Sequence, residues 1–453
     1  MRQDDEGDLP AYLDGAPVDP DQLGRVVDAA PPDRAVAPDE APKPTYPLLD
    51  APRDGVPAVV DDPGRLAEAI AAFRAGHGPV AVDAERASGH RYGQRAFLVQ
   101  LRREGSGTAL IDPAALPDLS ELSDALQDVE WVVHAASQDL PCLAEVGLRP
   151  SHLFDTELGS RLAGFSRVGL AAVVEHLLGL GLAKEHSAVD WSIRPLPEPW
   201  LRYAALDVEV LVELRDALAA ELERQGKLDW AREEFAALVA APPAPPRVDP
   251  WRRTSGLHRV RNRRQLAVVA ELWNAREELA RQQDVSPGRI IPDRSIVEVA
   301  LAQAVTHREL SALAGFTGRG SRRHLGVWSE AVARGMALPE AELPPLHLPA
   351  DGPPPARVWP DRDPVAASRL ARTRLALTAL AARHTLPVEN LLSPDAVRRL
   401  AWSPPEPVDL PAVQGFLRDY GAREWQIGLA AGLIVDAFAD PGTPAEITVL
   451  AED

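Results

Sequence analysis

Two carboxylates early in the chain have a spacing that would let them share a metal ion. Asp83 and Glu85 close the apolar run Pro79–Asp83 (PVAVD), whose pattern predicts a strand. Side chains alternate across a strand, so the two carboxylates project from one face about 6–7 Å apart. An isolated Asp-x-Glu pair is more often a solvated strand end, so this pair gains meaning only if further ligands join it.

Two later segments supply such candidates. Asp139 lies in the first predicted helical turn after the apolar strand Trp131–His134, in WVVHAASQDLPCL. Tyr203 and Asp207 are four residues apart in WLRYAALDVEVLVEL, so they share one face of a predicted helix. Each has a structural alternative: Asp139 would complement a helix dipole, and Tyr203 would pack on the core beside a half-exposed Asp207. His134 is better explained as a structural residue than as a ligand.

Taken together, Asp83, Glu85, Asp139 and Asp207 have one natural shared use. Hard oxygen ligands without a cysteine pair or a histidine cluster favour Mg²⁺ or Mn²⁺ over zinc. Two such ions can clamp a phosphodiester, one activating the attacking water and the other stabilising the leaving oxygen. Tyr203, one helical turn before Asp207, is placed to orient that water.

The segments around these residues predict a mixed α/β domain. Three short apolar runs joined by short loops predict an antiparallel meander, and alternating helix and strand patterns follow it. The predicted strands are Pro79–Asp83, Phe97–Arg102, Thr108–Asp112 and Trp131–His134, and the predicted helical segments are Leu119–Leu126, Gln138–Glu145 and most of Glu157–Leu238.

Proline-rich breaks divide the chain of 453 residues into modules. Residues 1–50 are acidic and rich in Asp, Pro and Ala, so we expect a disordered tail. The linker Ala241–Pro246 (APPAPP) and the interruption Leu343–Pro360 separate the rest. These breaks predict an α/β domain over residues 55–240 and two all-helical domains over residues 248–340 and 363–440.

The charge is unevenly distributed. The whole chain carries a net charge of −19, but Arg247–Met336 holds 16 Arg and 9 Asp or Glu, a net of +7, as expected of a nucleic-acid-binding module. Cys142 is the single cysteine, so an intrachain disulfide is excluded. Without a long apolar run or a signal-peptide pattern, we expect a cytoplasmic protein with no membrane association, and nothing implies a protein partner.

Three segments together resemble a known family. VAVDAERASGHRYGQRAFLVQLRR, HAASQDLPCL and YAALDVEVL are similar to the exonuclease motifs of the Tyr-containing DEDD subgroup. The stretch GLAAVVEHLLGLGLAKEHSAVDWSIRPLPEPWLRYAALD resembles ribonuclease D in particular. The resemblance implies a ribonuclease-H-like fold, with the four carboxylates as ligands of two Mg²⁺ or Mn²⁺ ions and Tyr203 holding the nucleophilic water. It also implies that Asp155 supports the ligands from behind. Ala84 and Arg86 depart from the family, which commonly has Thr and an aromatic residue there.

The basic segment resembles the helicase-and-RNase-D C-terminal (HRDC) domain, an accessory nucleic-acid binder, and residues 363–440 resemble a diverged second copy that is not basic. Arginine favours phosphate through bidentate contacts. The candidate RNA-binding residues are Arg252, Arg253, Arg261, Arg263, Arg264, Arg319, Arg322 and Arg323. A solvated basic surface is the structural alternative.

The sequence therefore predicts a 3′→5′ exoribonuclease that acts on the single-stranded 3′ end of a structured RNA, such as a tRNA precursor. Two alternatives stay open. One is a 3′→5′ exonuclease acting on DNA, since no motif reads a 2′-hydroxyl. The other is an RNA-binding protein without activity, which the presence of all five catalytic-type residues disfavours.

Overall fold

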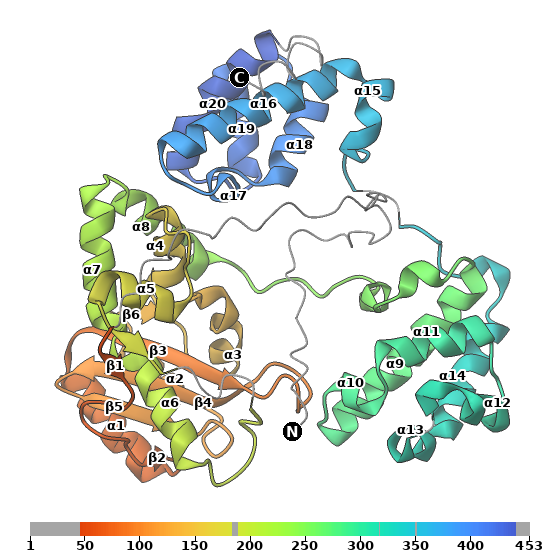
Figure 1. The fold of residues 1–453 in the computed structure, drawn as a ribbon, viewed down its shortest axis with the longest axis horizontal. Coiled ribbons are helices and arrows are strands. Elements are labelled where there is room, and N and C mark those ends of the chain that lie inside the picture. Colours follow the sequence, from red (N-terminus) through yellow and green to blue (C-terminus); the bar gives the residue numbers. More distant parts are fainter. Residues whose placement is uncertain (1–45, 184–188, 317, 349–350, 441–453) are drawn as a thin grey trace, which may run out of the picture. The chain divides into compact units, whose positions relative to one another are not determined.

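The computed structural model describes residues 46–183, 189–316, 318–348 and 351–440 (Figure 1). The predicted tail falls mostly in residues 1–45, outside the described residues. The remaining chain forms an α/β region followed by helical regions, which confirms the predicted fold class. None of the described helices is both long and apolar enough to cross a membrane.

A six-stranded mixed sheet forms the centre of the α/β region. The predicted meander is confirmed, because β3, β4 and β5 pair antiparallel, while β6 runs parallel to β3. Two further strands were not predicted, β2 and β7, which pair parallel at the two edges in the order β2-β5-β4-β3-β6-β7. The bounds are β2 (Val59–Val60), β3 (His77–Arg86), β4 (Ala96–Glu104), β5 (Gly107–Ile111), β6 (Glu130–Val133) and β7 (His152–Asp155).

The alternation of β3 divides its side chains between the two faces of the sheet. Val80 and Val82 belong to the core that includes residues of α1, α2 and α3. Ala81 lies on the other face, in a core with residues of α5 and α7, and α6 packs across β3, β4 and β5. The helices are α1 (Pro63–Ala75), α2 (Ser120–Ala125), α3 (Leu140–Glu145), α5 (Leu170–Leu178), α6 (Glu198–Glu209) and α7 (Leu211–Arg224).

Shorter elements complete the α/β region. A pair of two-residue parallel strands joins the start of the described chain to the segment after α5. Another helix, α8, packs against the edge strand β7. These elements are β1 (Leu48–Leu49), β8 (Gly181–Leu182), α4 (Thr156–Leu162) and α8 (Leu228–Ala240), together with the short 3-10 turn η2 (Ala136–Gln138).

The first helical region is built on two long helices in close contact. A Cβ at Gly335 of α14 would lie 2.7 Å from Val268 Cα of α9, so only glycine allows this approach. Trp328, Phe316 and Leu272 are fully buried around the contact. The elements are η3 (Pro250–Arg253), η4 (Leu257–Arg259), α9 (Arg263–Gln283), α10 (Pro287–Ile290), α11 (Asp293–Ala302), α12 (His307–Ala312), η5 (Ala314–Phe316), α13 (Arg319–Arg323), α14 (Leu325–Ala337) and η6 (Glu340–Glu342).

The second helical region has α16 and α20 as its main packing pair. Trp359 is fully buried beside Trp402, with ring centroids 4.9 Å apart. The elements are η7 (Ala356–Val358), α15 (Trp359–Arg362), α16 (Pro364–Arg383), α17 (Val388–Leu391), α18 (Pro394–Trp402), α19 (Leu410–Asp419) and α20 (Glu424–Ala439).

Candidate metal and phosphodiester site

Three of the predicted carboxylates meet where the carboxyl end of β3 faces α6. Asp83 and Glu85 project from one face of β3, and Asp207 reaches them from α6, which packs on that face. One carboxylate oxygen from each residue lies within 4.8 Å of the other two. Carboxylates held this closely repel each other unless a cation lies between them, so the arrangement suits a divalent ion.

Asp139 lines the same cleft but stands outside this tight group. It is the residue before α3, which begins at Leu140. Its carboxylate Oδ1 lies 3.4 Å from Nη2 of Arg86, the last residue of β3. The Nη1 group of Arg86 donates a hydrogen bond of 3.1 Å to the carbonyl oxygen of Gln138. The fourth predicted ligand is thus at the site, with a cationic side chain beside it.

Asp155 holds the loop that carries Asp139. Its carboxylate accepts hydrogen bonds from the backbone N–H groups of Ala135 (3.0 Å) and Ala136 (2.9 Å), and it also caps the start of α4. Ala135 has a left-handed backbone with φ of 62°, which a non-glycine residue adopts only when its surroundings fix it. Asp155 therefore supports the ligand loop through backbone contacts, a more specific role than the general support expected of it.

The carboxylates raise one another's pKa values. Burial, followed by the charges of Asp83, Asp207 and Asp139, raises the pKa of Glu85 to about 10. Burial and the nearby Asp83 charge raise the pKa of Asp139 to about 8. Burial also raises the pKa values of Asp83 and Asp207. A divalent cation would compensate this concentrated negative charge, and the all-oxygen donor set fits Mg²⁺ or Mn²⁺.

Tyr203 lies one helical turn before Asp207, as the sequence predicted. Its hydroxyl donates a hydrogen bond to the Asp207 carboxylate. Burial and the charges of Asp207 and Glu85 raise the pKa of the phenol well above its ordinary value, so it stays protonated at neutral pH. A protonated phenol at the edge of a carboxylate cluster can position a water molecule without removing its proton.

The cleft around these residues has a volume of about 650 Å³. Leu170, Leu182 and Leu211 form an apolar part of its wall, where the flat face of a nucleotide base can pack. His134 also lines the cleft, and its Nδ1 lies 2.9 Å from Thr156 Oγ1. Burial lowers the pKa of His134 to about 4, so the ring is neutral at physiological pH.

Two residues that were not among the predicted site residues make notable contacts around the sheet, the partly exposed Arg194 and the buried Gln100. Arg194 binds both carboxylate oxygens of Asp112 at 2.6 Å, and this fixes the segment before α6 to the end of β5. Gln100 lies directly opposite Asp83 in the sheet, is fully buried, and its amide has no hydrogen-bond partner among the described residues. Isolated charged or amide residues gave no signal, because their pairing is set by the tertiary fold.

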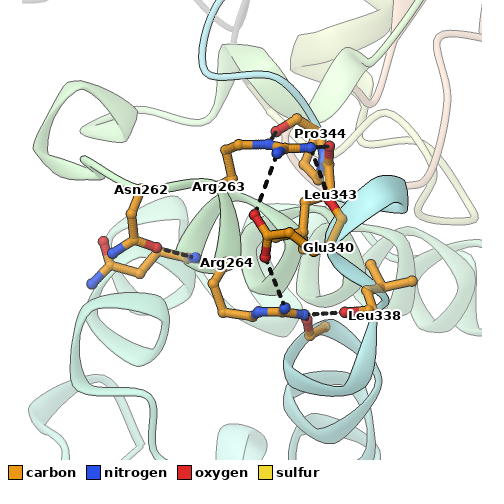
Figure 2. Close-up of polar contacts among 9 residues, drawn as sticks. Asn262, Arg263, Arg264, Leu338, Glu340, Leu343 and Pro344 are labelled. Atoms are coloured by element: carbon orange, nitrogen blue, oxygen red, sulfur yellow. Dashed lines mark hydrogen bonds and ion pairs between the residues drawn. The ribbon is translucent and has the colours of Figure 1, made fainter.

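Several predicted RNA-binding arginines bind the protein itself. Figure 2 shows Arg263 and Arg264, which share the carboxylate of Glu340 at 3.4 and 3.5 Å. Arg263 also donates to the backbone carbonyls of Glu340, Leu343 and Pro344, and Arg264 to that of Leu338. Their guanidinium groups therefore hold the end of the first helical region against the start of α9.

The remaining predicted arginines divide into further groups. Arg252 pairs with Asp249 at 2.9 Å and covers the Trp251 ring, and Arg322 donates to the carbonyl of Phe316. Three arginines are exposed, and their side chains make no hydrogen bond or ion pair with any described residue. They are Arg253, Arg261 and Arg323. The side chain of Arg319 lies outside the described residues.

Comparisons with known proteins agree with this geometry. A family model described as a 3′-5′ exonuclease matches residues 57–223, and an HRDC model matches residues 265–332. A model described as a 3′ to 5′ exonuclease C-terminal domain matches residues 352–438. The second helical region thus resembles an exonuclease C-terminal domain, and its relation to HRDC stays a prediction.

Ribonuclease D from Gluconacetobacter diazotrophicus is 34% identical over 351 residues, which cover 75% of this chain and 84% of that protein. The chain belongs to the ribonuclease D family. Ribonuclease D from Acidiphilium cryptum is 35% identical over 70% of this chain and 82% of its own length. As a ribonuclease D family member, the protein is a 3′→5′ exonuclease, an enzyme that hydrolyses phosphodiester bonds.

Solved structures extend the match to the fold. A protein from Bifidobacterium adolescentis has a TM-score of 0.80 at 39% identity and covers 87% of this chain and all of its own. Escherichia coli RNase D, described as an exoribonuclease involved in structured RNA processing, has a TM-score of 0.59 at 28% identity. It covers 82% of this chain and 98% of its own, so the ribonuclease D fold extends through the helical regions.

Proposed function

We propose that this ribonuclease D family member is a metal-dependent exoribonuclease that trims the 3′ end of structured RNA by a two-metal mechanism. The observation that carries the proposal is the convergence of Asp83, Glu85 and Asp207 within 4.8 Å, with Asp139 on the same cleft. These four carboxylates would hold the ions. Bound there, Mg²⁺ or Mn²⁺ would lower the pKa of the attacking water and stabilise the leaving 3′ oxygen.

Other residues of the site position the water, the terminal base and the loop that carries Asp139. Tyr203 orients the water through its hydroxyl, which Asp207 fixes by a hydrogen bond. The apolar wall formed by Leu170, Leu182 and Leu211 receives the terminal base and leaves its phosphodiester toward the carboxylates. Asp155 keeps the Asp139 loop in place during turnover, because it binds that loop through two backbone N–H groups.

The helical region with the HRDC match would contact the body of the RNA. The exposed arginines Arg253, Arg261 and Arg323 are available for phosphate groups, whereas Arg263 and Arg264 are committed to Glu340. This division supports a substrate with a structured body and a single-stranded 3′ end, such as a tRNA precursor. Support for RNA as the substrate also comes from relatives named ribonuclease D.

The variant Asp207→Asn tests this proposal. A 5′-labelled RNA and a matched DNA are incubated with Mg²⁺, with Mn²⁺ and with chelator, and the lengths of the products are followed. We expect the wild type to shorten RNA one nucleotide at a time from its 3′ end, and Asp207→Asn to lose on the order of 10³-fold in rate, because charge stabilisation worth several kcal/mol disappears.

The control is Asp216→Asn, which changes an exposed carboxylate on α7 that pairs with Arg215. It should retain wild-type activity. Full activity of Asp207→Asn, or activity that persists in chelator, would reject the metal mechanism. Faster shortening of DNA than of RNA would reject the substrate, and RNA binding without shortening by the wild type would favour the inactive alternative.

A further inference from the structure

Arg86 is the single cationic side chain among the described residues that line the cleft. The other charged residues of the lining are the carboxylates Asp83, Glu85, Asp139 and Asp207. His134 is neutral at physiological pH, since burial lowers its pKa to about 4. The carboxylates have an evident partner in divalent ions. Arg86 cannot bind a divalent ion, because its positive charge would repel the ion.

The path of β3 places Arg86 at the rim of the site. It follows Glu85 directly, and its side chain lines the same cleft as the carboxylates of Asp83 and Glu85. The pairing register with β4 shifts at this point, from Glu85 opposite Leu98 to Arg86 opposite Ala96. From there the guanidinium reaches Gln138 and Asp139 just before α3, and 26% of the side chain remains exposed.

Its present contacts leave most of its binding capacity unused. A guanidinium has five N–H donors arranged to grip two oxygens of one anion. Here one donor binds the carbonyl oxygen of Gln138 at 3.1 Å, and another nitrogen lies 3.4 Å from a single oxygen of Asp139. This ion pair is longer and less complete than the bidentate Arg194–Asp112 pair, which has two distances of 2.6 Å.

The reaction brings a second anion into the same space. A divalent ion bound by Asp139 would take over the charge that Arg86 now faces, and the phosphodiester of the substrate would enter beside it. Arginine binds phosphate oxygens in charge-assisted pairs that are roughly twice as strong as neutral hydrogen bonds. The donors of Arg86 that bind neither Gln138 nor Asp139 thus have an incoming partner, while its pair with Asp139 becomes redundant.

We propose that Arg86 is a phosphate-binding residue of the RNA 3′ end, and that Asp139 holds it in reserve until a divalent ion takes that carboxylate. This inference rests on the proposed function, because it concerns the nucleic acid bound at the same carboxylates. It predicts that Arg86 weakens metal binding before RNA arrives and strengthens RNA binding afterwards. A purely structural arginine would not have these opposite effects.

The test compares the wild type with Arg86→Gln, which keeps a donor for the Gln138 carbonyl but removes the charge. Binding is measured by fluorescence anisotropy with Ca²⁺ in place of Mg²⁺ to slow hydrolysis. Two short RNAs are used, one with a charged phosphorothioate as its last linkage and one with an uncharged methylphosphonate there. The control is Arg232→Gln, which removes an exposed arginine paired with Asp229 on α8.

We expect Arg86→Gln to bind the charged RNA about tenfold more weakly than the wild type, as the loss of about 1.4 kcal/mol implies. It should bind the uncharged RNA like the wild type. The effect on affinity of removing the Arg86 charge would then depend on the charge of the last phosphate linkage, which means that the two are coupled. Calorimetric titration with Mn²⁺ in the absence of RNA should show affinity increased about threefold or more in Arg86→Gln. Arg232→Gln should match the wild type throughout.

If Arg86→Gln lost the same affinity for both RNAs, or lost none for either, the inference would be overturned. Unchanged or weaker Mn²⁺ binding by Arg86→Gln would also overturn it. The outcomes separate this inference from the proposed function. A wild type that shortens RNA while Arg86→Gln shows no coupling refutes the role of Arg86 alone. Coupling in a wild type that shortens no RNA supports Arg86 as a phosphate contact and refutes the exoribonuclease. A wild type that binds neither RNA refutes both.

Discussion

At the level of single residues, the site brings together carboxylates whose charges, when ionised, the fold alone does not balance. The pKa of Glu85 rises from an ordinary 4.5 to about 10, and that of Asp139 from 3.8 to about 8. Without metal, the folded protein therefore binds protons at these carboxylates more tightly than the unfolded chain does. The stability that these protons contribute is fully present below the unfolded pKa values and is lost as the pH rises through the folded ones.

The metal-free protein should consequently become less stable as the pH rises. In chelator we expect the melting temperature to fall by roughly 5 °C or more between about pH 6 and about pH 9, because the carboxylates must ionise beside one another. Excess Mg²⁺ should flatten this dependence. Glu85→Gln should flatten it in chelator too, because the amide does not titrate. A melting temperature that rises over this range in chelator would contradict the account.

Single residues also show which features of the site can be predicted from the sequence. Asp83, Glu85 and the pair Tyr203–Asp207 each belong to a short local pattern, so the periodicity of a strand or a helix is enough to place them on common faces. The contact between Arg86 and Asp139 joins residues from different segments of the chain, at a point where the strand register shifts. No local pattern encodes such a contact.

At the level of elements, prediction succeeded where a strand carried an apolar run, as for the four-residue β6. β3, β4 and β5 have clear apolar runs with turn residues between them, and their antiparallel order was predicted. β2 has only two residues, and β7 has only two apolar residues between His152 and Asp155, so neither forms a clear apolar run in the sequence. The left-handed Ala135 was equally unpredictable, because Asp155 fixes it from β7.

The start of α9 allows a matched comparison between exposed and committed arginines. We expect Arg253→Ala with Arg261→Ala to weaken binding of a structured RNA and to lower the slope of log affinity against log salt by about 2. Stability should change by less than about 0.5 kcal/mol, because neither side chain has a partner among the described residues. Hydrolysis of a short single-stranded RNA should be unaffected.

Arg263 and Arg264, which pair with Glu340, should behave in the opposite way. Arg263→Ala with Arg264→Ala removes the guanidinium groups from Glu340 and from the carbonyls of Leu338, Leu343 and Pro344 (Figure 2). The expected loss is about 1–3 kcal/mol of unfolding free energy, measured by chemical denaturation. If this pair lowered the salt slope and the exposed pair lowered stability, the division of the basic residues would be wrong.

At the level of the whole molecule, the four carboxylates come from parts of the chain up to 124 positions apart, between Asp83 and Asp207. The sheet and α6 bring three of them together, and the loop after β6 adds the fourth. Charge is also distributed unevenly along the chain. The chain is acidic overall at −19, while a positive excess lies just before the HRDC match, in residues 247–264, which hold 7 Arg and 1 Asp and where the RNA body would bind.

The number of Mn²⁺ ions bound per chain tests the central claim most directly, because it requires neither a substrate nor turnover. Calorimetric titration, checked by electron paramagnetic resonance, should count two ions in the wild type and fewer than two in Asp207→Asn, with Asp216→Asn like the wild type. A wild type that binds no Mn²⁺, or an Asp207→Asn variant that still binds two ions with unchanged affinity, would contradict the account.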